Sequence, residues 1–123
     1  VSGFKMPKST DDEKAIRRKE IRNSMLGAAK VPYETACYAL DLLKLLPELA
    51  SLGNENAVSD VGVAGLLASA ALKGAIFNIE INLNSLPESY GVEMRTHLPE
   101  LSGEAKIYSR LCMEAVRNRL SNE

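Results

Sequence analysis

The feature that most constrains the fold is a run of small residues between a polar turn and two asparagines. The turn, Gly-Asn-Glu-Asn-Ala-Val-Ser-Asp, occupies residues 53–60, and the run leads to Asn78 and Asn82. A glycine inside a helix costs about 1 kcal/mol relative to alanine, so helix propensity alone does not explain this stretch. Small side chains allow another backbone to approach closely. We therefore expect a tightly packed helix, or a site. The small residues are Gly62, Ala64, Gly65, Ala68, Ser69, Ala70, Ala71, Gly74 and Ala75.

The spacing of apolar residues predicts an all-α fold, a bundle of long packed helices forming part of a single domain over residues 1–123. Helices are expected over residues 11–30, 32–52 and 59–86. Residues 87–103 contain Pro87, Gly91, Pro99 and Gly103, and a last helix is expected after them, ending near Leu120. Thr10 and Glu13 have the spacing of a capping box at the first helix start. Pro32 is expected either to kink that helix or to open the next one. The third helix carries little charge, so we expect other helices to surround it.

The charge balance argues against nucleic acid as a partner. Fifteen basic and 16 acidic residues give a net charge of −1, whereas a nucleic-acid surface needs a basic stripe. A basic cluster over residues 14–22 is interleaved with acidic residues. It is interpreted as a solvated helix face with i,i+4 pairs such as Glu13 with Arg17.

The cysteines and the single histidine exclude some kinds of site. Cys37 and Cys112 lack metal-ligand spacing and His97 is the sole histidine, so neither a zinc site nor a Ser-His-Asp triad is expected. Both cysteines follow apolar stripes and are interpreted as reduced and buried, which suits a cytoplasmic protein. No apolar run reaches the ~18 residues of a membrane span, and no signal peptide is visible. Because residues 1–7 begin without an initiator methionine, the chain is expected to belong to a larger protein.

Four segments resemble the cyclodeaminase/cyclohydrolase family, which includes the cyclodeaminase domain of formimidoyltransferase-cyclodeaminase. The opening Phe-Lys-Met-Pro-Lys at 4–8 and Thr-Asp-Asp-Glu-Lys at 10–14 are also similar to the start of that domain. The resemblance covers roughly residues 1–86, and the remainder matches only as a terminal helix. The four segments are Val-Pro-Tyr-Glu-Thr-Ala at 31–36, Gly-Asn-Glu-Asn-Ala-Val-Ser-Asp-Val-Gly-Val-Ala at 53–64, Ala-Leu-Lys-Gly-Ala at 71–75 and Asn-Ile-Glu-Ile-Asn-Leu at 78–83.

The resemblance implies an all-helical domain that forms a homodimer and acts on a one-carbon unit carried by tetrahydrofolate. One branch closes 5-formimidoyltetrahydrofolate to 5,10-methenyltetrahydrofolate and releases ammonia. Another opens methenyltetrahydrofolate with water to the 10-formyl form. The resemblance also implies a preceding helical half with a proline- and glycine-rich turn and a lysine-bearing segment. These 123 residues contain neither, so we interpret them as the C-terminal part of the domain. Its partners would be that missing half, a fused transferase domain, or both.

Asp60 is the candidate catalytic residue. Neither reaction needs a metal, because orientation and proton transfer dominate both. The helix dipole keeps a carboxylate ionised in the first helical turn. An anion there suits a base, or a counter-ion to the cationic methenyl bridge. The alternative for Asp60 is helix capping, and for the whole chain it is a non-catalytic helical dimerisation module.

The candidate substrate-binding residues are Asn54, Ser59, Asn78 and Asn82. Asn54 would bind a pterin or substrate amide, with a left-handed turn residue as the alternative. Ser59 is interpreted as the N-cap, close enough to touch a ligand. Asn78 and Asn82 lie on a helix expected to be buried, where amides need partners. Those partners are a ligand, a helix across a dimer interface, or backbone carbonyls.

Helix geometry separates the candidates into two groups. Asp60 and Asn78 are 18 residues apart, which is about 27 Å along a straight helix. They cannot both touch one reacting carbon within a subunit. Either an antiparallel dimer brings Asp60 of one chain near Asn78 or Asn82 of the other, or only one end of the helix is catalytic.

The remaining side chains considered are two cations, three aromatic residues and the histidine. Lys73 and Arg95 are either contacts for the folate glutamate or solvated cations. The aromatic residues Tyr33, Tyr38 and Phe77 are interpreted as core residues rather than as pterin-stacking groups, and His97 receives no role.

Overall fold

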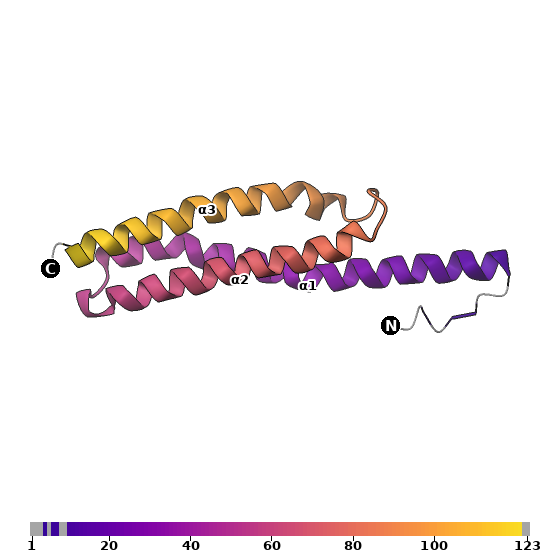
Figure 1. Ribbon diagram of the computed structural model, residues 1–123, viewed down its shortest axis with the longest axis horizontal. Helices are drawn as coiled ribbons and strands as arrows, with labels where there is room; N and C mark the ends of the chain where they lie inside the picture. Colours follow the sequence, from indigo (N-terminus) through magenta and orange to yellow (C-terminus); the bar gives the residue numbers. More distant parts are fainter. Residues whose placement is uncertain (1–3, 5, 8–9, 122–123) are drawn as a thin grey trace.

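The computed structural model describes residues 4, 6–7 and 10–121, and these form an up-down-up bundle of three long helices (Figure 1). The helices are α1 (Asp11–Leu52), α2 (Val58–Asn84) and α3 (Val92–Ser121). A short 3₁₀ turn, η2 (Glu55–Ala57), precedes α2. The described residues contain no strand, which confirms the predicted all-α class.

α1 is one helix where two were predicted. The Thr10 side chain accepts a hydrogen bond from the Glu13 amide at 3.1 Å, as expected for one half of the capping box. Pro32 lies inside the helix and removes one main-chain hydrogen bond. Ala29 and Ala36 on either side of it are fully buried. Their packing keeps the chain helical, so the prediction that a second helix opens at Pro32 is wrong.

α2 agrees closely with its prediction, but α3 begins earlier than the sequence indicated. Between them Gly91 has φ +66, the only positive φ among the described residues. A Cβ atom there would lie 2.7 Å from Leu83 Cδ2, so glycine suits both the backbone conformation and the space. α3 continues through Pro99. Met94 and Leu101, which lie before and after Pro99, are both buried. Their burial stabilises the helix despite the proline.

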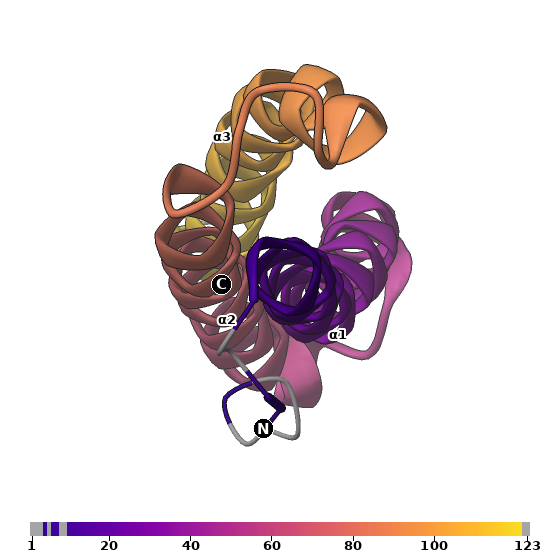
Figure 2. The ribbon, with the colours of Figure 1, turned by 90° about the vertical axis from the view of Figure 1, so that its right-hand side faces the viewer.

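Two glycines allow α3 to approach the α2 backbone closely. A Cβ atom at Gly62 would lie 3.3 Å from Val116 Cγ1, and one at Gly65 would lie 2.8 Å from Cys112 Sγ. The prediction of close packing is therefore confirmed for this side of α2. Seen nearly end-on, the helices surround a common core (Figure 2). Its largest fully buried side chains are Leu43, Leu72, Ile79, Leu83, Leu101, Val58 and Cys112.

The opposite side of α2 is open, so the prediction of an enclosing set of helices is wrong for a single chain. Phe77 is 69% exposed, and nothing lies within 4 Å of a Cβ atom placed on Gly74. Tyr38 on the neighbouring side of α1 is 73% exposed. Tyr38 and Phe77 are therefore surface residues and not core residues, because no described helix covers them. The outer apolar face, as we call it, consists of Val31, Tyr38, Leu42, Leu45, Leu49 and Leu52 of α1 with Val63, Leu66, Leu67, Phe77 and Ile81 of α2.

One described helical stretch, Glu55–Asn84, is long and apolar enough to cross a membrane by length and composition alone. The central helices of packed bundles meet the same criterion, so this is weak evidence for a membrane span.

Arg119 of α3 caps the carboxyl end of α1. Its guanidinium donates to the carbonyl oxygens of Ala50, Ser51 and Gly53 at 2.9, 2.7 and 3.0 Å. Helices leave their last carbonyls unpaired, and α1 has no basic residue in its own last turn. The guanidinium therefore supplies both the donors and the positive charge that this end lacks.

Arg95 does the same at the end of α2. It donates to the carbonyl oxygens of Leu83 at 2.6 Å and Tyr90 at 2.8 Å, with longer bonds to Leu86 and Pro87. Because these carbonyls occupy its donors, Arg95 is neither a folate contact nor a solvated cation, and both predicted alternatives are wrong.

We expect Arg119→Met to lower the free energy of unfolding by about 1–2 kcal/mol, because carbonyls that are now paired lose charged donors. The measurement is urea denaturation followed by circular dichroism. Arg117→Met is the matched control, since Arg117 is exposed on the same helix and should change stability by less than about 0.5 kcal/mol. Equal losses in the two variants would contradict the capping role.

Candidate functional site

A groove of about 490 Å³ between α1 and α2 brings together three of the four segments that carry the family resemblance. Pockets for small molecules span roughly 300–1,000 Å³, so this groove is the candidate site. We call it the seam groove. It is lined by Ala28, Val31, Pro32 and Thr35 of α1 and by Ala75, Asn78 and Asn82 of α2.

The seam groove presents few polar groups, and most retain hydrogen-bonding capacity. The Asn82 side-chain amide donates to the Asn78 backbone carbonyl at 2.8 Å, which leaves Asn82 Oδ1 free to accept. The Asn78 side chain has no hydrogen-bond partner among the described residues. The Thr35 hydroxyl donates to the Val31 carbonyl at 3.1 Å and can still accept.

Pro32 adds a backbone acceptor that the sequence analysis missed. Proline has no amide hydrogen, so the Ala28 carbonyl, four residues earlier, lacks its helical donor. Ala28 and Pro32 both line the seam groove. The signal in the sequence was a proline in the middle of a long helical pattern.

The environments of the two asparagines differ from expectation. Both were predicted to be buried, but Asn78 is exposed and Asn82 is half-buried. The open outer side of α2 accounts for this difference. Water can therefore solvate them until a ligand or a partner displaces it.

Asn54 and Ser59 lie away from the seam groove, at the opposite end of α2. Asn54 Oδ1 accepts from the Asn56 amide at 2.9 Å, and its backbone is extended with φ −62. The left-handed alternative for Asn54 is therefore wrong. Ser59 is exposed within the first turn of α2. The N-cap position belongs to Ala57, so the N-cap interpretation of Ser59 is wrong.

Asp60 is a solvent-exposed carboxylate in the first turn of α2. Its side chain makes no hydrogen bond or ion pair among the described residues, so it is not engaged in capping. Asp60 and Asn78 lie on the same side of α2, since 18 residues make about five complete turns. The distance between them remains about 27 Å, and the fold does not bring Asp60 to the seam groove within one chain.

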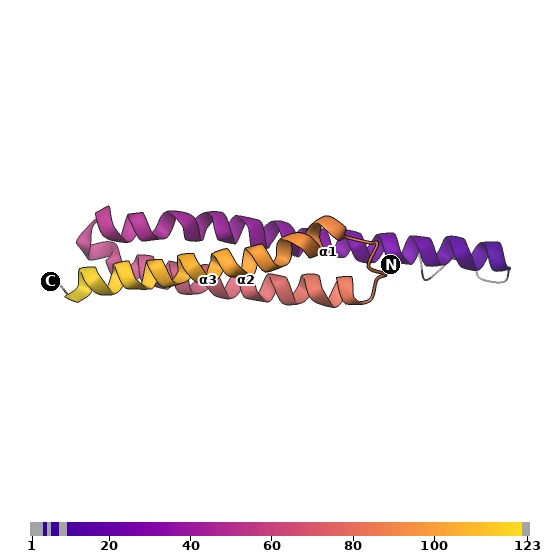
Figure 3. The same ribbon diagram turned by 90° about the horizontal axis from the view of Figure 1, so that it is seen from above.

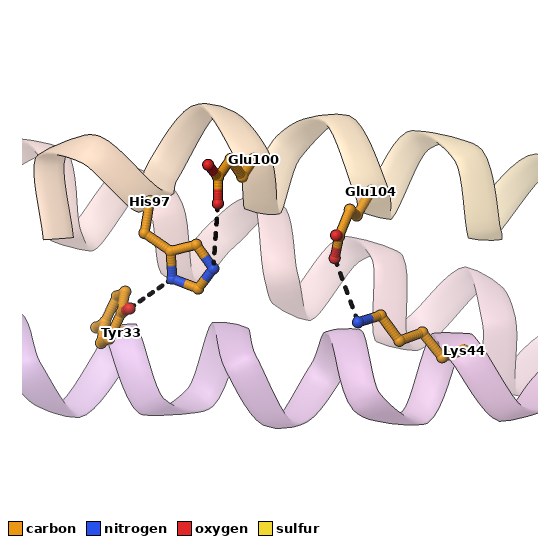
Figure 4. Close-up of polar contacts among 5 residues, drawn as sticks. All are labelled: Tyr33, Lys44, His97, Glu100 and Glu104. Atoms are coloured by element: carbon orange, nitrogen blue, oxygen red, sulfur yellow. Dashed lines mark hydrogen bonds and ion pairs between the residues drawn. The ribbon is translucent and has the colours of Figure 1, made fainter. Parts of the chain in front are cut away.

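A polar cluster on the other flank of α1 joins it to α3 (Figure 4). The Tyr33 hydroxyl lies 2.5 Å from His97 Nδ1, and His97 Nε2 lies 4.0 Å from Glu100 Oε2. Lys44 pairs with Glu104 at 3.3 Å between the same two helices. Sequence reasoning missed the link between Tyr33 and His97 because 64 residues separate them. Tyr33 packs against the core, as predicted.

Both cysteines are free thiols. Cys112 is fully buried, as predicted, whereas Cys37 is half-buried beside Tyr33. Burial raises the pKa of both thiols and of the Tyr33 hydroxyl. Within the described part of the chain, no group of three or more His, Cys, Asp or Glu residues is placed to hold a metal ion.

These pKa directions predict alkaline destabilisation. Because the pKa of each thiol is raised above 9.0 in the fold, the unfolded chain loses these protons at lower pH. The stability contributed by the protonated thiols is complete below pH 9 and is lost as pH rises through the raised values. The urea midpoint should therefore fall above about pH 9. Cys112→Ala should show a shallower fall, and an unchanged pH dependence in that variant would contradict the assignment.

Comparison with known proteins decides the family. Residues 1–98 match the formiminotransferase-cyclodeaminase family. The chain belongs to this family. The match includes every segment that lines the seam groove, and it confirms the resemblance identified from the sequence.

Relatives from several organisms align with nearly the whole chain. It is 30% identical to a methenyltetrahydrofolate cyclohydrolase of Methylorubrum extorquens over 98% of this chain and 59% of the relative. It is 30% identical to the formimidoyltransferase-cyclodeaminase of Rattus norvegicus, and 32% identical to that of Gallus gallus. Each of these alignments covers 97% of this chain and 22% of the relative. The chain thus spans less than two thirds of these relatives, and their names associate the family with folate one-carbon metabolism.

Proposed function

We propose that the protein acts on a one-carbon derivative of tetrahydrofolate, as a formimidoyltetrahydrofolate cyclodeaminase or a closely related methenyltetrahydrofolate cyclohydrolase. The observation that carries this proposal is the seam groove, because family-specific segments of α1 and α2 line it. Its walls are small and apolar, with amide, hydroxyl and carbonyl groups between them. Such a lining suits a flat heterocycle whose edges form hydrogen bonds.

Both reactions place similar demands on the site. In cyclodeamination the folate N10 attacks the formimidoyl carbon, and the departing nitrogen takes a proton and leaves as ammonia. In cyclohydrolysis a water attacks the methenyl carbon and gives up a proton, and the bond from that carbon to N5 then breaks as N5 takes a proton, which leaves the 10-formyl form. Asn78 and Asn82 would orient the pterin or the substrate amide. Asp60 would act as a base or as a counter-ion to the methenyl cation, and no metal is required.

We further propose a homodimer in which Asp60 of one copy completes the seam groove of the other. The outer apolar face supports this arrangement, since exposed apolar patches of this extent mark interaction sites. Gly74 lies on that side of α2 with open space around it, as a closely approaching helix would require. Further partners proposed from the longer relatives are a preceding helical half and a fused transferase domain. A cytoplasmic location fits this assignment.

The experiment is turnover of both substrates by the intact protein, followed by the absorbance of methenyltetrahydrofolate. Rising absorbance with ammonia release from the formimidoyl substrate would identify the deaminase. Accelerated loss of absorbance would identify the cyclohydrolase. If neither folate is bound or converted, the enzyme proposal fails. The non-catalytic dimerisation module, which the outer apolar face also supports, would then be the better assignment.

A further inference from the structure

Among the described residues, a second groove is lined by four cationic side chains and by no carboxylate. Its volume is about 400 Å³, and it lies between the N-terminal part of α1 and Ser85 at the end of α2. Glu20, which interrupts the basic cluster in the sequence, does not line it. We call it the basic groove. Its lining residues are Lys14, Arg17, Arg18, Ile21, Arg22, Met25 and Ser85.

The arrangement of the helices leaves this surface uncovered by α2 and α3. In two perpendicular views the N-terminal part of α1 extends beyond the α2–α3 connection (Figures 1 and 3). Ile21 and Met25 are half-buried where α1 still meets the bundle. One turn further out, Arg18 and Lys14 are exposed. The basic groove is therefore a concave surface of one charge sign, which is more than the solvated helix face expected from the sequence.

Two of the guanidinium groups lie over aromatic rings. Arg17 Cζ lies 5.5 Å from the centroid of the Phe4 ring, and Arg22 Cζ lies 5.9 Å from that of Tyr90. Contact with a ring face fixes a guanidinium plane while its N–H edges stay available to an acceptor.

Arg17 also carries an unsatisfied donor. Arg17 Nε is buried and has no hydrogen-bond partner among the described residues. Burying such a group unpaired costs free energy, so unpaired buried donors are rare. An anion would supply the acceptor if the Arg17 side chain turned this atom toward the basic groove.

We propose that the basic groove binds a small anion carrying two or more phosphate or carboxylate groups. Three guanidinium forks offer bidentate donors to such groups, and Lys14 adds a fourth positive charge. The net charge of the chain is −1, so the attraction is local and not that of a generally basic protein. The site shares no residue with the seam groove and does not depend on the proposed folate chemistry.

The test is isothermal titration calorimetry of the intact protein with tripolyphosphate and, separately, with citrate at about 0.1 M salt. We expect saturable binding of at least one probe. Arg17→Gln combined with Arg18→Gln should weaken it roughly tenfold or more, because two charge-assisted contacts are lost. Arg18→Gln alone alters only an exposed side chain and should weaken binding severalfold, which keeps the test valid if the double variant unfolds.

The matched control is Lys19→Gln combined with Lys106→Gln. This pair removes the same charge, but neither residue lines the basic groove. The affinity of this double variant for either probe should stay within about twofold of that of the unmodified protein. Tighter binding of tripolyphosphate would identify a phosphate ligand, and tighter binding of citrate a carboxylate ligand. Failure of both probes to saturate, or an equal loss in the control, would overturn the proposal.

Discussion

Asp60→Asn is expected to reduce turnover about 100-fold or more, the usual contribution of a positioned proton-transfer group. The substitution keeps the size of the side chain and removes its charge. Asp60 is exposed and unpaired among the described residues, so stability should change by less than about 0.5 kcal/mol. The measurements are kcat from methenyltetrahydrofolate absorbance and the urea midpoint. Asp41→Asn is the matched control, because Asp41 is also exposed but lies on α1. Comparable turnover by the two variants would exclude Asp60 from the reaction.

Mixing two inactive variants tests whether the site spans two chains. Asn82→Leu should also be inactive, since it removes the seam groove's half-buried amide. In a symmetric dimer, a mixture of Asp60→Asn and Asn82→Leu chains would form heterodimers with one intact site each. Roughly a quarter of the original activity should return, because half of the dimers would be mixed. If no activity returns while each variant still folds, the shared site is wrong, although Asp60 itself would keep its role.

Gly65→Val is expected to lower the free energy of unfolding by about 2–3 kcal/mol, the cost of overpacking a filled core. The first added carbon would lie 2.8 Å from Cys112 Sγ and 3.2 Å from Met113 Cε. Cys112 is fully buried and has little room to move. Thermal and urea unfolding would measure the loss.

Gly74→Val is the control for Gly65→Val, since it makes the same change in the same helix. Nothing lies within 4 Å of a Cβ atom at Gly74, and valine has the better helix propensity. A single chain should therefore be slightly stabilised. Equal losses at the two glycines would contradict the close approach of α3 at Gly65. A loss at Gly74 alone that grows with protein concentration would show instead that the outer apolar face packs against another copy.

Local patterns were sufficient to predict the helices but not all of their ends. The Gly53 stop and the small-residue run located α2 closely, because those signals act within a few residues. Pro32 and Pro99 favoured breaks that do not occur. Their local cost is offset by burial of side chains such as Ala36 and Leu101 against other helices. Sequence spacing alone does not report that packing.

The site was predictable in parts but not as an arrangement. Asn78 and Asn82 were identified from their spacing, and the segment at 31–36 from its resemblance to the family. Only the fold shows that they line one groove. Tyr33 with His97, and Arg119 with the end of α1, involve partners 64 or more residues apart. No local periodicity encodes such contacts.

The two arginine caps have a consequence for how the molecule opens. The carboxyl ends of α1 and α2, one at the turn of the α1–α2 hairpin and one at its open end, are both capped by side chains of α3, from positions 24 residues apart (Arg119 and Arg95). If α3 detaches, both helix ends lose these hydrogen bonds at the same time. Amide hydrogen exchange near Leu52 and near Asn84 should then proceed at similar rates, as expected for one cooperative unit instead of independent fraying.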